Sequence, residues 1–119
     1  MSVLVAVADS REGREALTAA VAEARQLATD LVVVNLALGA LDTGLIPADL
    51  AHEVVNRMGA GDSDQVDVVL DALEQRPAVT RVVIGLRRRS PLGKAVLGST
   101  SQRILLESPV PVLAVKLAP

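Results

Sequence analysis

The chain has 119 residues, half of them hydrophobic and 22% charged, with a formal net charge of −2. This length and composition predict one globular domain, residues 1–119, and argue against a disordered chain. Phe, Tyr, Trp and Cys do not occur. Without aromatic rings there is no base-stacking platform for single-stranded nucleic acid, so we expect no nucleic-acid partner. Without thiols, disulfides and sulfur-ligated metal sites are excluded.

The N-terminal residues and the lengths of the apolar runs indicate where in the cell the protein is expected. No apolar run approaches the roughly 18 residues of a membrane span. The opening "MSVLVAV" lacks a basic start and a cleavage site, so no signal peptide is expected. We therefore expect a cytoplasmic protein with no membrane partner.

The first part of the chain predicts a β-α-β unit. Two short apolar runs, 2–8 and 31–38, are typical of buried strands. Aliphatic residues between them recur with helical spacing, and Asp9 or Ser10 can cap that helix. The two strands are therefore expected to be parallel, with a right-handed crossover.

The middle of the chain is harder to assign. Residues 39–50 are rich in turn formers and too short for more than one helical turn. Residues 51–58 fit a helix or a third strand, and we prefer the strand because "GAGDS" follows at once. A helix is expected over 62–76, with Asp62 and Gln65, or Ser63, at its start.

Three further elements complete the predicted fold. A buried strand is expected over 81–85 and a final strand over 110–117. Between them, a short helix is expected over 99–108, with Ser99 and Gln102 in capping-box spacing. Together, the predicted strands and helices form an α/β sandwich of about five mostly parallel strands. Such sheets bind ligands at the carboxyl ends of their strands, where the polar turns 8–10 and 85–101 are expected to lie.

The segment 85–103 combines cations, glycines and hydroxyl groups. Its five basic residues are Arg87, Arg88, Arg89, Lys94 and Arg103. Because the whole chain sums to −2 and this segment contributes +5 without an acid, the rest sums to −7. This asymmetry favours a discrete anion as ligand, although a solvated basic loop explains it as well.

The glycine spacing in this segment excludes two known phosphate motifs. Gly93-Lys94 is followed by Ala95, which breaks the P-loop pattern, and G-x-G-x-x-G does not occur. What remains is Gly98 entering a helix at Ser99, where free N–H groups and the helix dipole favour an anion. Turn glycines and a simple N-cap are the alternative explanation.

The spacing Gly85-x2-Arg88-x9-Gly98-Ser99 resembles the motif G-x2-G-x9-G-[ST] of the universal stress protein family. The end "GSTSQRILLESPVPVLAVK" and the opening "VLVAVADSREGREAL" resemble that family's last helix and strand and its first strand and helix. The resemblance implies a Rossmann-like sheet of order 3-2-1-4-5, here with the second helix shortened or missing.

The same resemblance implies a stress-response regulatory protein that binds ATP or AMP, with or without Mg²⁺. Arg88 stands where the family has its second motif glycine, and Ala8 aligns with the acid that usually ends the first strand. The nucleotide-binding candidates are Asp9, Gly85, Arg88, Gly98, Ser99, Thr100 and Ser101. No general base is evident, so any ATP hydrolysis or self-phosphorylation at Ser99 or Ser101 should be slow. A dimerising module of the same fold that has lost its nucleotide is the alternative.

The last strand also predicts a partner. Pro111 marks 110–117 as an edge strand, and an exposed edge invites pairing. The family often dimerises through this strand, so a homodimer through Val110 to Lys116 is expected.

Other candidate sites are weaker. His52 is the only histidine and has no cysteine or second histidine to form a metal site or triad. Four aspartates lie near or on the second helix, where a solvated face explains them better than a metal; they are Asp62, Asp64, Asp67 and Asp71. Ser90 in "RRRSP" fits a basic-directed phosphorylation site.

Overall fold

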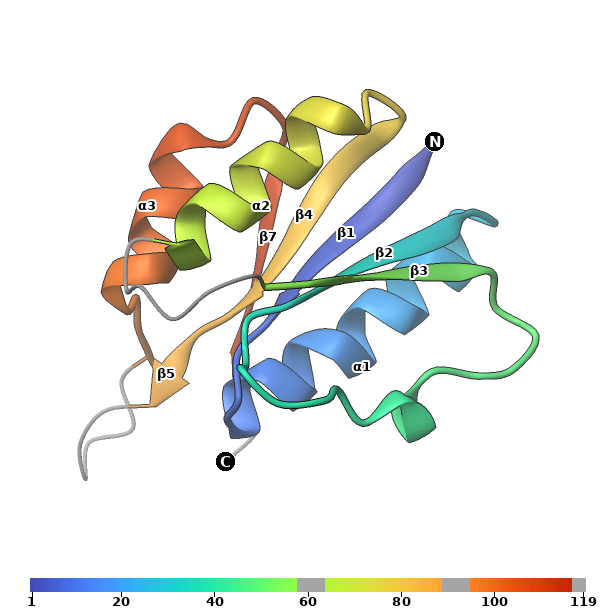
Figure 1. The fold of residues 1–119 in the computed structure, drawn as a ribbon, viewed down its shortest axis with the longest axis horizontal. Coiled ribbons are helices and arrows are strands. Elements are labelled where there is room, and N and C mark those ends of the chain that lie inside the picture. The colour runs from blue at the N-terminus through green and yellow to red at the C-terminus, as the bar shows by residue number, and fades with distance from the viewer. Residues whose placement is uncertain (58–63, 89–94, 117–119) are drawn as a thin grey trace.

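The computed structural model describes residues 1–57, 64–88 and 95–116. Five parallel strands form one sheet in the order β3-β2-β1-β4-β7, which confirms the predicted order 3-2-1-4-5 (Figure 1). The strands are β1 (Ser2–Val7), β2 (Asp30–Asn35), β3 (His52–Asn56), β4 (Val79–Gly85) and β7 (Val112–Val115).

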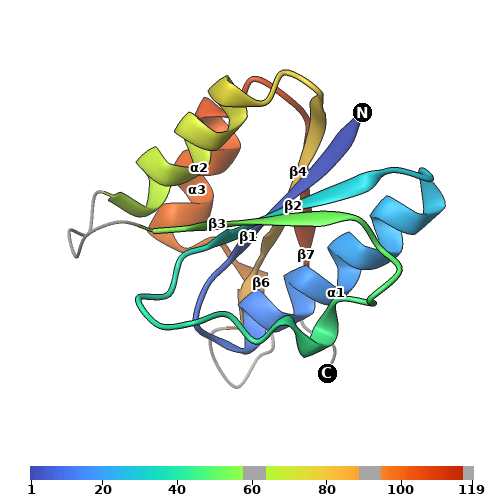
Figure 2. The same cartoon turned by 45° about the vertical axis from the view of Figure 1, so that its right-hand side comes forward.

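Three helices cover the two faces of the sheet. Helix α1 (Arg11–Gln26) lies on one face, and α2 (Asp64–Gln75) and α3 (Ser99–Glu107) lie together on the other (Figures 1 and 2). Alternate residues of β1 point to opposite layers, so Val5 packs under α1 whereas Leu4 packs under α2 and α3. Because both faces of the central strands are covered, these strands appear in the sequence as continuous apolar runs.

Ser10 caps the first helix. Its hydroxyl accepts a hydrogen bond from the backbone N–H of Gly13 at 3.2 Å, so of the two predicted caps the structure uses Ser10 rather than Asp9. The helix ends at Gln26 with Leu27 as its C-cap. Ala28 follows the cap, and its φ of 53° is left-handed and uncommon for a residue with a Cβ.

The segment between β2 and β3, all of which the structure describes, forms no α-helix. It contains only the 3₁₀ turn η1 (Thr43–Leu45), as the turn-rich sequence predicted. Ile46 and Leu50 are nevertheless buried in the core layer under α1. The Asp49 carboxylate accepts a hydrogen bond from the Arg25 guanidinium at 2.7 Å, which holds the pKa of Asp49 below its usual value. The loop therefore contributes to the core on this face of the sheet without an α-helix.

Residues 52–56 form a strand, which confirms the preferred assignment. β3 lies at an edge of the sheet, and its Glu53 forms an ion pair at 2.7 Å with Arg76, the residue that follows α2. The hydrogen bond from Arg76 lowers the pKa of the Glu53 carboxyl.

The last third of the chain contains an additional ladder and a strand boundary that differ from the sequence prediction. The connection after β4 forms a short antiparallel ladder of β5 (Arg87–Arg88) and β6 (Ala95–Val96), which the sequence did not suggest. β7 begins at Val112 instead of residue 110. Pro111 lies just before the strand, and its carbonyl accepts a hydrogen bond from Val82 N–H at 2.9 Å.

Within the described ranges, no helix combines the length and the apolar character that crossing a membrane requires.

Candidate functional site

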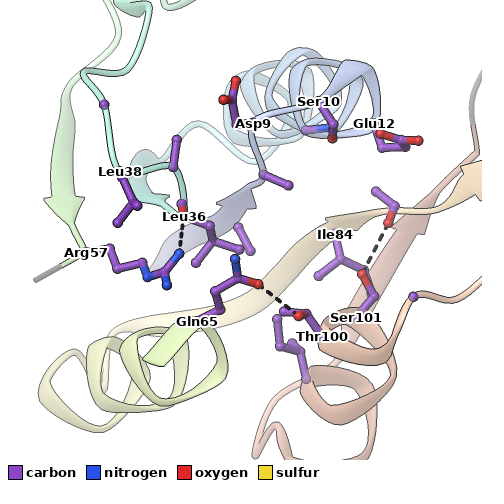
Figure 3. A pocket seen from close by; sticks show the side chains of 18 residues that line it. Asp9, Ser10, Glu12, Leu36, Leu38, Arg57, Gln65, Ile84, Thr100 and Ser101 are labelled. Atoms are coloured by element: carbon purple, nitrogen blue, oxygen red, sulfur yellow. Dashed lines mark hydrogen bonds between the residues drawn. The ribbon is translucent and has the colours of Figure 1, made fainter. Parts of the chain in front are cut away.

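A cavity of about 720 Å³ lies at the carboxyl ends of the strands (Figure 3). Its walls come from the turn after β1, residues 36–39 after β2, Arg57 after β3, the start of α2, the end of β4 and the start of α3. This is the edge of a parallel sheet at which ligands usually bind, and the volume is in the range of small-molecule sites, roughly 300–1,000 Å³.

The structure brings most of the predicted residues to this cavity. Asp9, Gly85, Gly98, Thr100 and Ser101 line it. Ser99 does not line it and is exposed to solvent. The backbone of Arg88 belongs to β5, and its side chain lies outside the described part of the chain.

Gly85 has a packing role that the sequence did not reveal. A Cβ atom built on Gly85 would lie 2.4 Å from the backbone carbonyl oxygen of Glu12. Only a glycine therefore lets the first turn of α1 rest against the end of β4. Gly13 is constrained in the same way, because its Cβ would lie 1.9 Å from the carbonyl oxygen of Ala8.

The start of α3 differs from the predicted capping box of Ser99 and Gln102. Gly98 is the N-cap, and no side chain caps the helix. The Gln102 N–H instead bonds the Gly98 carbonyl at 2.9 Å as part of the helix. The first backbone N–H groups of α3 therefore lack a side-chain acceptor, and the positive end of the helix dipole faces the cavity that Gly98 lines.

The hydroxyl groups in this turn already donate hydrogen bonds within the protein. Thr100 Oγ1 donates to Gln65 Oε1 at 3.0 Å, and Ser101 Oγ donates to the Gly85 carbonyl at 3.3 Å. A ligand phosphate would therefore meet the backbone N–H groups first, whereas contact with these hydroxyl protons requires that an internal bond break.

Asp9 lies at the rim of the cavity and is exposed. The turn that carries it is tight, with a hydrogen bond from Ser10 N–H to the Ala8 carbonyl at 2.8 Å. The Asp9 carboxylate is directed away from Gln65 and Thr100 on the opposite wall (Figure 3).

Arg57 and Gln65 both line the cavity, although neither was proposed as a site residue from the sequence. Arg57 follows β3, and its Nη1 donates to the Leu36 carbonyl at 3.0 Å. Gln65 lies in the first turn of α2 and holds Thr100. The rule that selected residues 8–10 and 85–101, namely the carboxyl ends of parallel strands, applies equally to the end of β3 and would have found Arg57.

The weaker candidates have structural explanations. His52 is exposed, with Nδ1 2.9 Å from the Leu50 carbonyl oxygen. Asp67 and Asp71 are exposed on α2, as a solvated face requires. Among the residues that the structure describes, no group of three His, Cys, Asp or Glu side chains is arranged to hold a metal ion. Asp62, Ser63 and Ser90 lie outside the described residues.

Comparison with known proteins agrees with this architecture. The universal stress protein family model matches residues 48–116. A universal stress protein from Mycolicibacterium smegmatis is 36% identical over 115 residues, which cover 87% of this chain and 88% of that protein.

Solved structures share the fold. A universal stress protein from Archaeoglobus fulgidus has a TM-score of 0.68 at 23% identity and is covered over 97% of both chains. The universal stress protein from A. fulgidus in complex with dAMP has a TM-score of 0.64 at 20% identity and covers 97% of this chain and 96% of its own. The family match over more than half of the chain and the relative at 36% identity show that this chain belongs to the universal stress protein family.

Proposed function

We propose that the chain binds an adenine nucleotide, AMP or ATP, in the cavity at the carboxyl edge of the sheet and acts as a cytoplasmic stress-response regulatory protein. The observation that carries this proposal is the start of α3. Its first turn has no side-chain cap and faces a cavity of about 720 Å³. An uncapped helix start beside a cavity suits an anionic ligand.

The comparisons support the nature of the ligand. The protein belongs to a family with a member, from A. fulgidus, whose structure was solved in complex with dAMP. In the present chain, Gly85, Gly98, Thr100 and Ser101 all line one cavity. The adenine nucleotide would place its phosphate at the α3 end and its base toward residues 36–38.

Thermal unfolding in the presence of AMP or ATP tests this proposal. A ligand that binds only the folded protein stabilises it by about 2.7 kcal/mol at a concentration 100 times its Kd. Unfolding followed by far-ultraviolet circular dichroism should therefore shift to higher temperature as nucleotide is added. An unchanged Tm at millimolar AMP and ATP would contradict the proposal.

A second candidate function is a dimerising module that has lost nucleotide binding. The observations that favour it are Arg88 at the second motif position and the hydroxyls of Thr100 and Ser101, which already bond within the protein. The variant Arg88→Gly separates the two. If the arginine side chain blocks the site, the variant gains nucleotide binding that the parent lacks.

Dimerisation through β7 is proposed for either function. β7 is an edge strand of the sheet, and Leu113 on it is 41% exposed. Pairing with β7 of a second copy would cover this leucine and satisfy the free edge.

A further inference from the structure

We propose that Gln65 binds the phosphate group of the nucleotide and that Thr100, predicted as a phosphate ligand, acts instead by holding Gln65 in position. This inference rests on the proposed function and assigns a recognition residue to that site. It starts from the hydrogen bond of 3.0 Å between Thr100 Oγ1 and Gln65 Oε1.

The bond fixes which face of the amide meets the ligand. A side-chain amide has one acceptor oxygen and an NH₂ group with two donors. Because Oε1 accepts the Thr100 proton, Nε2 is on the other side of the amide and points into the cavity (Figure 3). Gln65 therefore directs its NH₂ donors into the cavity, while its oxygen is held by Thr100.

The position of the Gln65 amide places it near the expected phosphate group of the nucleotide and not near its adenine base. Gln65 lies in the first turn of α2, and its partner Thr100 lies in the first turn of α3. The starts of both helices are thus joined by one side-chain bond at the same wall of the cavity. The positive dipole end of α3 and the Gln65 donors act on the same volume.

The wall opposite Gln65 and Thr100 carries a negative charge. It is formed by the turn from β1 into α1, which carries the exposed carboxylate of Asp9. A phosphate is repelled from that wall and attracted to the wall of Gln65 and Thr100. The cavity is therefore divided between an acidic side and a donor side, and the phosphate belongs to the donor side.

The roles of the two residues differ in a way that can be measured. Gln65 touches the ligand, so loss of its amide removes a hydrogen bond to a charged group. Thr100 orients Gln65, so loss of its hydroxyl acts through Gln65. The variants Gln65→Met and Thr100→Val remove these groups while retaining approximate side-chain size.

The experiment measures AMP and adenosine affinity by equilibrium dialysis, because adenine absorbs where this chain without Trp or Tyr does not. Gln65→Met should weaken AMP roughly tenfold to hundredfold, the loss expected for one hydrogen bond to a charged group, and should change adenosine by less than about twofold. Gln75→Met is the matched control, since Gln75 is exposed at the far end of the same helix. Circular dichroism spectra identical to the parent's confirm folding.

The double variant distinguishes a positioning role from a direct contact. If Thr100 acts through Gln65, Thr100→Val weakens AMP binding alone but adds little in the Gln65→Met background, and Thr100→Ser restores binding. Additive losses in the double variant would show that Thr100 contacts the ligand itself and would overturn its positioning role.

The remaining outcomes separate this inference from the proposed function. AMP binding that is unchanged in Gln65→Met overturns the inference and leaves the nucleotide site intact. Equal losses for AMP and adenosine overturn the assignment to phosphate, because Gln65 would then contact the nucleoside. A parent protein that binds neither ligand contradicts the proposed function, and the inference fails with it.

Discussion

The end of β4 touches the first turn of α1 at Gly85 and Glu12, where a single added methyl group would lie 2.4 Å from a backbone oxygen. This contact sets the distance between two walls of the cavity, since Glu12 and Gly85 both line it. The first motif glycine therefore shapes the cavity through packing, whatever ligand occupies it.

Substitution of Gly85 by alanine should destabilise the protein by about 1–3 kcal/mol, because backbone atoms of β4 and α1 must move apart. Gly39→Ala is the matched control. Gly39 also lines the cavity, but no atom lies within 4 Å of the position of its added Cβ. Urea unfolding followed by circular dichroism measures both variants, and equal stability of the two would contradict this account of Gly85.

The loop between β2 and β3 should contribute stability through two buried side chains. Ile46→Ala or Leu50→Ala should each cost about 2–4 kcal/mol, as for other aliphatic core residues. Leu45 is 40% exposed in the same loop, so Leu45→Ala should change the free energy of unfolding by no more than about 0.5 kcal/mol. If all three variants behave like Leu45→Ala, the loop does not contribute to the core.

The ion pair of Glu53 with Arg76 should give a pH-dependent contribution. The pKa of Glu53 is lowered in the folded protein from its ordinary value of 4.5, so the pair stabilises the fold above that pH. The contribution is lost as the pH falls through the lower folded pKa. Glu53→Gln should therefore reduce stability at pH 7 by at most about 1 kcal/mol, since the pair is solvent-exposed.

The stability difference between the parent and Glu53→Gln should disappear as the pH falls from 5 toward about 3, measured by urea unfolding at each pH. Glu74→Gln, which removes an exposed carboxylate of α2 two residues before Arg76, is the control. A difference that grows on acidification would have the wrong sign for this pair.

A dimer through β7 should be sensitive to charge at Leu113. Leu113→Lys places an ammonium group at the proposed contact and should produce a monomer in sedimentation velocity. Leu45→Lys is matched in exposure, 40% against 41%, and should leave the oligomeric state unchanged. A monomeric parent, or a dimeric Leu113→Lys variant, would contradict pairing at this strand.

Most of the fold could be predicted because its central strands are buried on both faces. The runs that contain Val5, Val33 and Val83 have one structural solution, a parallel sheet covered by helices. β3 was ambiguous because it is an edge strand with only partly buried valines. The ladder of β5 and β6 was missed because two-residue strands leave no pattern in the sequence.

Less of the site could be predicted, for reasons of geometry. Motif spacing indicated Gly85 and Gly98, and both line the cavity. Gln65 comes from another helix, 35 residues away from Thr100, and only the packing of α2 against α3 joins them. Ser99 was expected at the cavity, but with Gly98 as the N-cap its side chain is left in solvent.

The central claim, that the cavity holds an adenine nucleotide, is tested most directly by the ultraviolet spectrum of the protein after gel filtration with AMP or ATP. Because the chain has no Trp, Tyr or Phe, a band at the adenine maximum in the protein fraction comes from bound nucleotide. This account predicts such a band at near-stoichiometric amount, with the same nucleotide released by heat. A protein fraction with a flat spectrum after incubation with either nucleotide would contradict it.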